Sequence, residues 1–228
     1  MNLQTEKKYL RKGFKVVIGV DEAGRGPLAG PVVASAVIVH LESKNQSQNF
    51  QELLNKARDS KKLSPKQREK IFELIKKTPE IQFAYSFVSE KIIDKINIEQ
   101  ATFLAMRKSI QKLEKKLNLK PDIILVDGNR KISQLNILQK TIIKGDDKIF
   151  SIALASIISK VMRDKKMIAL NKKYPQYHFE IHKGYPTKLH LQLLKKYGPS
   201  QVHRKSFQPV QLAIKTSKNS INNCFIKS

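Results

Sequence analysis

Apolar positions along this chain gather in short runs, and the spacing within each run predicts the element that it forms. Runs rich in valine and isoleucine, bounded by glycine, proline or charged residues, are typical of strands. Four such runs occur, at residues 15–21, 31–39, 122–127 and 140–144, and a run rich in aromatic residues at 83–88 predicts a further strand. Because these runs dominate the first part of the chain, we expect one sheet to be built mainly from them.

Segments with apolar residues three and four positions apart predict the helices. The sequence Ser-Pro-Lys-Gln at 64–67 combines a capping serine, a proline at the first helical position and a glutamine three residues on, so a helix should begin there. Asn97 caps a longer helix that ends before Pro121, and the patterns at 151–170 and 187–197 predict a C-terminal helical portion. We therefore expect an α/β protein with a mixed sheet flanked by helices.

The length of 228 residues is enough for one domain with a small appendage. We place this domain at 13–210, including the C-terminal helical portion, and we expect 211–228 to be a flexible polar tail. Met1–Lys12 lacks the apolar segment of a secretory signal, and no run reaches the length of a membrane span, so we expect a cytoplasmic protein with no membrane partner. Cys224 is the only cysteine, which excludes an internal disulfide. The absence of an obvious interface helix favours a monomer.

The charge of the chain is strongly unbalanced. Lysine and arginine total 44 against 19 aspartate and glutamate residues, which gives a formal charge of +25. A charge this large predicts a polyanionic partner, of which nucleic acid is the first candidate. Alternatively, most of the lysines reflect a drift of composition towards lysine, isoleucine and asparagine and only solvate the surface. Charge alone does not choose between these explanations.

Carboxylates follow three of the predicted strands. Asp21 and Glu22 end the first strand, Asp127 ends the fourth, and Asp146 and Asp147 come after the fifth. The ligand crevice of an open α/β sheet lies outside the carboxyl ends of its strands, so these acids can meet at one point. Like charges so close repel one another unless cations hold them, and hard oxygen ligands suit Mg²⁺ or Mn²⁺. Two such ions about 4 Å apart can stabilise both oxygens of a phosphodiester displacement.

Each of these acids also has a simpler explanation, because an aspartate at the end of a strand commonly begins a turn or caps a helix. Spacing alone leaves Asp146 and Asp147 equivalent. It does not exclude Asp59, Asp122 or Asp164 either.

A glycine-rich segment, GRGPLAG at 24–30, follows the first acidic pair. It is not a dinucleotide-binding fingerprint, because its spacing differs, a strand follows it instead of a helix, and the acids before it would repel a pyrophosphate. A loop whose bare backbone approaches a ligand closely, with Arg25 supplying charge, explains it better. A glycine-rich turn without a ligand remains the alternative.

Six separated segments of the chain form a recognisable set when they are taken together. They are GVDEAGRGPLAGPVV at 19–33, DSKKLS at 59–64, LVDGN at 125–129, KGDDKIFSIALASIISKVMRD at 144–164, HKGYPT at 182–187 and HRKSFQPV at 203–210. Together they closely resemble the ribonuclease HII family. The resemblance covers about residues 15–210 and is specific, because all six occur in the family's order.

The resemblance implies a ribonuclease H-like mixed sheet flanked by helices, and an endonuclease that cleaves the RNA strand of RNA–DNA hybrids. It also implies nicking 5′ of ribonucleotides embedded in DNA, which leaves 3′-hydroxyl and 5′-phosphate ends. Asp21, Glu22, Asp127 and Asp146 match the family's four catalytic, metal-binding acids, and this match selects Asp146 over Asp147. The implied cofactor is Mg²⁺ or Mn²⁺, used in a two-metal mechanism.

The resemblance also implies how the substrate is recognised. Gly24, Arg25 and Gly26 match the loop that contacts the ribose 2′-hydroxyl, and Tyr185 matches the tyrosine placed against the sugar at an RNA–DNA junction. This assignment makes physical sense, because the 2′-hydroxyl is what distinguishes RNA from DNA at one position. Further basic residues are similar to the family's phosphate-facing positions: Lys61, Lys62, Lys160, Arg163, Lys183 and Arg204.

Some assignments stay open within this resemblance. His182 and His203 either contact phosphate or form hydrogen bonds within a loop, and neither is needed as a metal ligand. The related ribonuclease HIII is disfavoured, because it carries an additional N-terminal domain and only about fourteen residues precede the first strand here. A non-catalytic nucleic-acid-binding protein would bind with strong salt dependence but would not need the acids. A sliding clamp is a candidate partner of the tail.

Overall fold

The computed structural model describes residues 3–41, 46–57 and 63–215. The chain divides into two compact units. Unit 1 comprises Met1–Ala23, Val33–Phe87 and Thr102–Met162, and unit 2 comprises Gly24–Val32, Val88–Ala101 and Arg163–Ser228.

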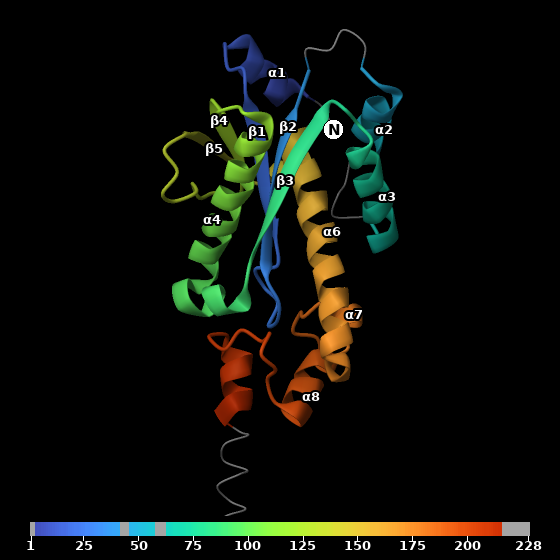
Figure 1. The fold of residues 1–228 in the computed structure, drawn as a ribbon, viewed down its shortest axis with the longest axis vertical. Helices are drawn as coiled ribbons and strands as arrows, with labels where there is room; N and C mark the ends of the chain where they lie inside the picture. Colours follow the sequence, from blue (N-terminus) through green and yellow to red (C-terminus); the bar gives the residue numbers. More distant parts are fainter. Residues whose placement is uncertain (1–2, 42–45, 58–62, 216–228) are drawn as a thin grey trace, which may run out of the picture. The chain divides into compact units, whose positions relative to one another are not determined.

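A five-stranded sheet forms the centre of unit 1, with the strand order β3-β2-β1-β4-β5 (Figure 1). β2 runs antiparallel to β1, whereas β4 runs parallel to both β1 and β5. This mixture confirms the expected mixed sheet. The strands are β1 (Val17–Ala23), β2 (Val32–Val39), β3 (Ile81–Val88), β4 (Ile123–Asp127) and β5 (Leu138–Ile142).

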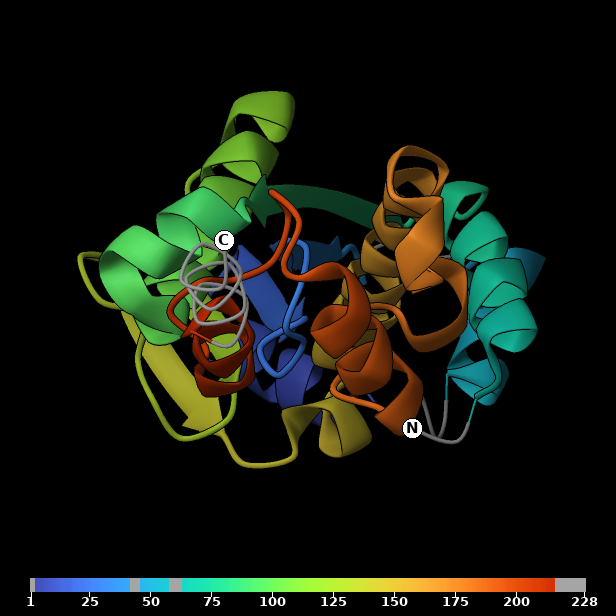
Figure 2. The same cartoon turned by 90° about the horizontal axis from the view of Figure 1, so that it is seen from below.

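The helices of unit 1 cover both faces of this sheet. The part of α4 at 102–117 lies on one face, while α2, α3 and the first part of α6 lie on the other (Figures 1 and 2). The helices of the described residues are α1 (Gln4–Arg11), α2 (Gln48–Lys56), α3 (Pro65–Lys76), α4 (Glu90–Leu117), α5 (Gly145–Lys148), α6 (Phe150–Lys173), the 3₁₀ turn η1 (Pro175–Tyr177), α7 (Phe179–His182), α8 (Lys188–Tyr197) and a last helical segment at 208–215.

The core of unit 1 joins α6 to the sheet and to α2 and α3. Phe50 of α2 meets Phe150 of α6 edge to face, with ring centroids 5.9 Å apart, and both rings are fully buried. Gly19 of β1 allows a still closer approach, because a Cβ atom there would lie 2.5 Å from Ser151 Oγ. This contact fixes α6 directly against the strand that carries the first acids.

Two helix starts follow from capping chemistry. Ser64 and Gln67 form the expected capping box, in which each side chain bonds the other residue's backbone N–H. Asn97 has a φ of 64° and interrupts α4, and its side chain accepts a hydrogen bond of 3.0 Å from Gln100 N–H. The predicted helix therefore begins at Asn97 as expected, but a preceding turn of helix starts at Glu90.

The N-terminal residues form a helix that the sequence pattern did not predict. α1 is polar along most of its length, yet Glu6 is only 2% exposed. Its Oε1 atom accepts a hydrogen bond of 2.9 Å from Ser151 N–H at the start of α6. A carboxylate is favoured there, because the first N–H groups of a helix lack partners within the helix.

Unit 2 has an apolar core of its own, centred on Ala29, Met167, Tyr177, Phe179 and Val202. A final helical segment covers 208–215 and packs Val210, which is fully buried, against Leu28 and Leu194. The expected boundary between domain and tail at residue 210 therefore falls inside a helix, and Cys224 lies outside the described residues. Within the described ranges, no helix is long and apolar enough to cross a bilayer.

Candidate active site

The first acids meet because β1 and β4 are parallel neighbours. Val20 pairs with Val126 in the register of the two strands, so the next residues, Asp21 and Asp127, are neighbours at the same edge of the sheet. Asp21 is 4% exposed, and its Oδ1 atom accepts a hydrogen bond of 2.7 Å from Glu22 N–H. The expectation that carboxyl ends of strands bring these acids together is therefore met for this pair.

Asp146 reaches the same edge by a different route from the one that strand prediction suggested. β5 ends at Ile142, the chain turns through Lys144 in the left-handed conformation, and Asp146 lies in the short helix α5. Gly145 N–H at the start of α5 donates a hydrogen bond of 2.6 Å to Asp127 Oδ1. Asp146 is 3% exposed, whereas Asp147 is exposed. Burial therefore distinguishes Asp146 from Asp147, which their spacing in the sequence did not.

Burial and mutual repulsion both raise the pKa values of these acids, and burial has the larger effect. Burial raises the pKa of Asp21 well above its usual value, and the nearby charges of Glu22 and Asp127 raise it further. Burial also raises the pKa of Asp127, Gly145 N–H opposes this shift, and the charge of Asp146 adds to it. The four acids are thus linked pairwise through their charges, and each pair would gain from a cation between its members.

The donor chemistry of this cluster fits a hard divalent cation, because it offers carboxylate oxygens without sulfur or imidazole. Among the described residues, however, no three His, Cys, Asp or Glu side chains are grouped so that they hold one ion as they stand. Repulsion acts pairwise, between Asp21 and Glu22, between Asp21 and Asp127, and between Asp127 and Asp146.

Ser156 and Lys160 of α6 extend the cluster, and the sequence patterns did not single out Ser156. The Lys160 ammonium donates a hydrogen bond of 2.7 Å to Ser156 Oγ, and Ser156 in turn forms a hydrogen bond that lowers the pKa of Asp21. Lys160 was expected to face a phosphate. In the structure its ammonium group bonds the hydroxyl group that in turn bonds Asp21, and only the spacing of four residues on a helix could have signalled this link.

In unit 2, a buried arginine binds the backbone of the glycine-rich segment. Arg204 is fully buried and donates hydrogen bonds to the carbonyl oxygens of Gly24 at 2.6 Å, Arg25 at 2.9 Å and Gly30 at 3.0 Å. All three guanidinium nitrogens therefore have partners in the loop. This placement disfavours the expected direct contact of Arg204 with a phosphate, which stays a prediction.

A second buried arginine completes this support. Arg163 is 1% exposed and donates to the carbonyl oxygens of Ala29 and Pro31, both at 3.2 Å. Gly24 has a φ of 99°, and a Cβ atom there would collide with the Arg163 side chain. Glycine is thus required at this position both by its backbone conformation and by the arginine packed beneath it.

Tyr185 lies beside this loop within unit 2. The residue is 46% exposed, and its Cε1 atom lies 3.8 Å from where a Cβ atom of Gly26 would be. The Arg163 guanidinium carbon lies 5.5 Å from the ring centroid, in the range of a cation–π contact. Leu28 N–H donates a hydrogen bond of 2.8 Å to Gly184 O, which joins the loop to the segment that carries the tyrosine. The residues expected to sense the ribose therefore lie together.

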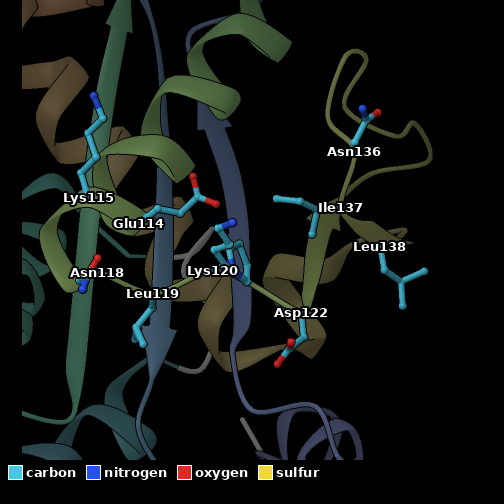
Figure 3. A pocket seen from close by; sticks show the side chains of 10 residues that line it. Glu114, Lys115, Asn118, Leu119, Lys120, Asp122, Asn136, Ile137 and Leu138 are labelled. Carbon is cyan, nitrogen blue, oxygen red and sulfur yellow. The ribbon is translucent and has the colours of Figure 1, made fainter.

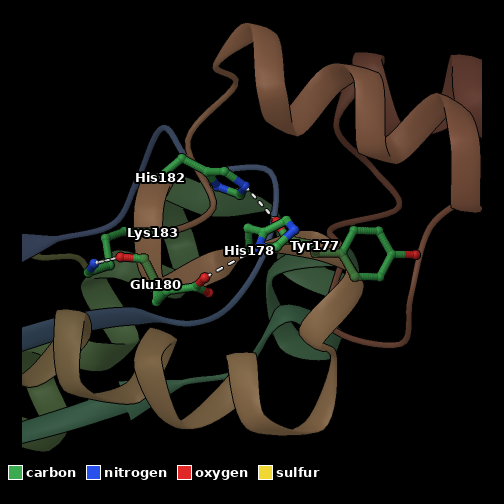
Figure 4. Close-up of polar contacts among 5 residues, drawn as sticks. All are labelled: Tyr177, His178, Glu180, His182 and Lys183. Carbon is green, nitrogen blue, oxygen red and sulfur yellow. Dashed lines mark hydrogen bonds and ion pairs between the residues drawn. The ribbon is translucent and has the colours of Figure 1, made fainter.

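The remaining expected basic residues differ in placement. Arg25 is exposed, and the half-buried Lys183 donates to the carbonyl oxygen of Glu180, close to the bond of 2.8 Å between His182 Nε2 and Tyr177 O (Figure 4). Lys61 and Lys62 lie outside the described residues.

A cavity of about 660 Å³ in unit 1 lies away from the acids. Its lining includes Glu114, Lys120, Asp122 and Leu138 (Figure 3). Asp122 directly precedes β4, whereas Asp127 ends it, so the cavity lies at the opposite end of this strand. Cavity size is therefore not a guide to the reactive groups in this protein.

Comparison with known proteins points to one family. The model of the family described as ribonuclease HII matches residues 18–210. The ribonuclease HII of Caldicellulosiruptor bescii is 50% identical over 204 residues, which cover 90% of this chain and 92% of that protein. The ribonuclease HII of Endomicrobium trichonymphae is 48% identical over 216 residues, covering 95% and 96%.

Solved structures show the same fold. The ribonuclease H2 of Pyrococcus horikoshii OT3 is similar with a TM-score of 0.71 and 26% identity, over 89% of this chain and 98% of that one. Bst-RNase HIII, solved with Mn²⁺, has a TM-score of 0.71 at 17% identity, over 90% and 70%. The ribonuclease HII of Archaeoglobus fulgidus, solved in complex with PCNA, has a TM-score of 0.65 at 24% identity, over 85% and 96%.

Proposed function

Because the chain belongs to the ribonuclease HII family, whose members are metal-dependent endonucleases acting on RNA–DNA hybrids, we propose that it also nicks duplex DNA 5′ of embedded ribonucleotides. In this reaction water adds to the phosphorus and the bond to the 3′-oxygen breaks, so the products carry 3′-hydroxyl and 5′-phosphate ends. The observation that carries the proposal is the parallel register of β1 and β4, since it makes Asp21 and Asp127 neighbours at one sheet edge.

The metal ligands of this proposal are Asp21, Glu22, Asp127 and Asp146, and the cofactor is Mg²⁺ or Mn²⁺. Bound cations would supply charge stabilisation for the attacking and leaving oxygens. The protein contributes the positions of its carboxylates: the strand register orients two of them, and Gly145 N–H fixes Asp127. Ser156, which accepts a hydrogen bond from Lys160, itself forms a hydrogen bond that lowers the pKa of Asp21 and so opposes the effect of burial and repulsion.

Substrate recognition in this proposal belongs to the loop at Gly24, Arg25 and Gly26 and to Tyr185, which together contact the ribose that carries the 2′-hydroxyl. Two observations support this role: the ring lies against Gly26, and almost half of the tyrosine is exposed. We further propose that Arg163 and Arg204 act through the loop carbonyls that they hold, and not by contact with phosphate. The formal charge of +25 supports binding along a polyanionic duplex, with Lys61, Lys62 and Lys183 as candidate phosphate contacts.

The test is cleavage of a DNA duplex that contains one ribonucleotide, with and without Mg²⁺ or Mn²⁺, followed by identification of the product ends. The variant Asp146→Asn should lower the rate on the order of a hundredfold or more, the scale of losing one charged group at a reaction centre. Asp147→Asn is the matched control, because this neighbouring acid is exposed, and it should retain nearly the full rate. Equal rates for the two variants would refute the assignment of the metal site.

A further inference from the structure

Three buried histidines form a cluster in unit 2 that the proposed chemistry does not use. His182, His190 and His203 are 6%, 0% and 1% exposed. The rings of His182 and His190 are stacked with centroids 4.3 Å apart, and Nε2 of His190 lies 3.0 Å from Nε2 of His203. Imidazoles enclosed this completely need a hydrogen-bond partner for each ring nitrogen, so the partners define what the cluster does.

The partners fix the protonated nitrogen in two of these rings. The Ser200 backbone N–H can only donate, and it lies 2.9 Å from His203 Nδ1, so this nitrogen accepts and the proton is on Nε2. The Tyr185 carbonyl can only accept, and it lies 2.9 Å from His190 Nδ1, so the proton of His190 is on Nδ1. Nε2 of His190 is then free to accept from His203. One continuous chain of donors runs from Ser200 through both rings to Tyr185.

The third ring serves the same segment of backbone. His182 Nδ1 accepts a hydrogen bond of 3.1 Å from Gly184 N–H, so the proton is on Nε2, which donates to Tyr177 O (Figure 4). Tyr185 N–H donates to His182 O at 2.9 Å, and Tyr185 O also accepts from Thr187 N–H at 2.8 Å. The backbone of Tyr185 is therefore held on both its donor and its acceptor side.

The chain of hydrogen bonds from Ser200 through His203 and His190 to Tyr185 is called the histidine relay below. Its end at His203 is attached to the glycine loop. His203 pairs with Ala29 in an isolated antiparallel bridge, and Arg204 N–H donates to Leu28 O at 2.8 Å. The relay therefore connects two segments of the backbone. One is the segment at His203 and Arg204, which pairs with Ala29 and Leu28, and the other contains Tyr185.

The rings are uncharged at neutral pH, as this arrangement requires. Burial lowers the pKa of His190 to about 4, and the nearby His182 contributes to this shift. Burial and repulsion by His190 lower the pKa of His203 to about 3. A protonated ring would carry a second N–H where the relay needs an acceptor, so the neutral state and the bonding pattern support each other.

We propose that His190 and His203 are positioning residues for recognition of the RNA–DNA junction: their relay holds the Tyr185 backbone so that the ring stays against Gly26. The proposal rests on the proposed function, in which Tyr185 contacts the junction sugar. In this proposal His190 and His203 affect which substrate is cleaved, although neither residue contacts the substrate. Cleavage of continuous hybrids, which does not depend on a single junction, should depend on them much less.

Two substitutions of one histidine separate the two bonds that it makes. His190→Asn retains an amide N–H near the position of Nδ1 and can still donate to Tyr185 O, whereas His190→Gln keeps a polar atom near Nε2 and loses that bond. The readout is kcat/KM for a duplex with one ribonucleotide divided by kcat/KM for a continuous RNA–DNA hybrid. This ratio should fall about tenfold in His190→Gln, the effect of one neutral hydrogen bond, and by less than about threefold in His190→Asn.

The variant Tyr185→Ala distinguishes failure of this inference from failure of the proposed function. If Tyr185→Ala leaves the ratio unchanged, the tyrosine does not recognise the junction and the proposed function fails at that point. If Tyr185→Ala lowers the ratio while His190→Gln keeps the wild-type value, the relay does not position the tyrosine and the inference is overturned. The hybrid rate of each variant reports whether it has folded.

Nitrogen-15 spectra of the histidine rings in the wild-type protein test the relay without any substitution. We expect a neutral His190 with its proton on Nδ1, and neutral His182 and His203 with their protons on Nε2, at pH 7. A charged ring, or the opposite form of His190 or His203, would overturn the proposal even if every variant failed to fold.

Discussion

Lowering the pH from 7 to 5 should destabilise the protein through His190 and His203. A histidine whose pKa is depressed in the folded state binds its proton mainly when unfolded, so the folded state loses stability as the pH falls below about 6.5, the usual value. The loss continues down to about pH 4 for His190 and about pH 3 for His203. Because both folded values lie below 5, the loss between pH 7 and 5 depends only on the unfolded value. It is about 2 kcal/mol for each ring at about 1.4 kcal/mol per pH unit.

Other groups titrate in the opposite sense, which makes a control variant necessary. The raised pKa values of Glu6, Asp21 and Asp127 mean that these carboxyl groups bind protons more readily when folded, so they stabilise the protein as the pH falls. The double variant His190→Asn, His203→Gln retains these carboxyl groups and removes both imidazoles. The wild type should therefore lose more free energy of unfolding than the double variant between pH 7 and 5.

Urea unfolding at the two pH values measures this difference directly. We expect the wild type to lose about 2 to 4 kcal/mol more than the double variant, the lower figure applying if protonating one ring already breaks the shared hydrogen bond. Equal losses in the two proteins would show that the fold does not keep the rings neutral. The arrangement of protons inferred for the relay would then be wrong.

Three further predictions concern the loop and the acids. Gly24→Ala should lower the rate of cleavage at a single ribonucleotide at least tenfold, because the new Cβ atom would collide with Arg163. Gly13→Ala is the control, since its φ of 90° imposes the same backbone strain where no atom is near, and it should retain the wild-type rate. Equal rates for the two variants would exclude the collision with Arg163 as the cause. Arg204→Met should destabilise the protein by about 3 kcal/mol or more in urea unfolding, because it leaves three buried carbonyl groups without their donor. Ser156→Ala should raise the pKa of Asp21 further, because it removes a hydrogen bond that lowers this pKa. The Mg²⁺ or Mn²⁺ concentration needed for half-maximal cleavage should then increase severalfold. An unchanged metal requirement would show that Ser156 is not part of the site.

Local sequence patterns were enough to predict the strands that carry Asp21, Glu22 and Asp127, but not the short helix α5 that carries Asp146. All five strands lie where the apolar and aromatic runs predicted them, although β3 begins at Ile81 and β5 covers Leu138–Ile142 instead of 140–144. The capping box at Ser64 and the cap at Asn97 were readable because each depends on residues within four positions of one another. α1 was missed because its buried contact, Glu6 with Ser151, joins residues 145 positions apart.

The orientation of long basic side chains was beyond the reach of the sequence. Arg163 and Arg204 stand in motifs of a nucleic-acid enzyme, so contact with phosphate was the natural expectation. The structure instead buries both beneath the glycine loop, because that loop turns its carbonyl oxygens inward and those oxygens need donors. His190 gave no signal at all, since its role depends on a neighbour thirteen positions away that the chain brings close only after folding.

The two halves of the proposed activity divide along the same line as the two compact units. Asp21, Glu22, Asp127 and Asp146 all belong to unit 1, while Gly24–Val32, Tyr185 and the histidine relay all belong to unit 2. Changes in unit 1 should therefore slow cleavage of every substrate by a similar factor, because they act on the reaction common to all. Changes in unit 2 should alter the ratio between single ribonucleotides and continuous hybrids. A variant of Asp127 that changed this ratio, or a variant of His190 that left it constant while slowing both reactions equally, would argue against this division of roles.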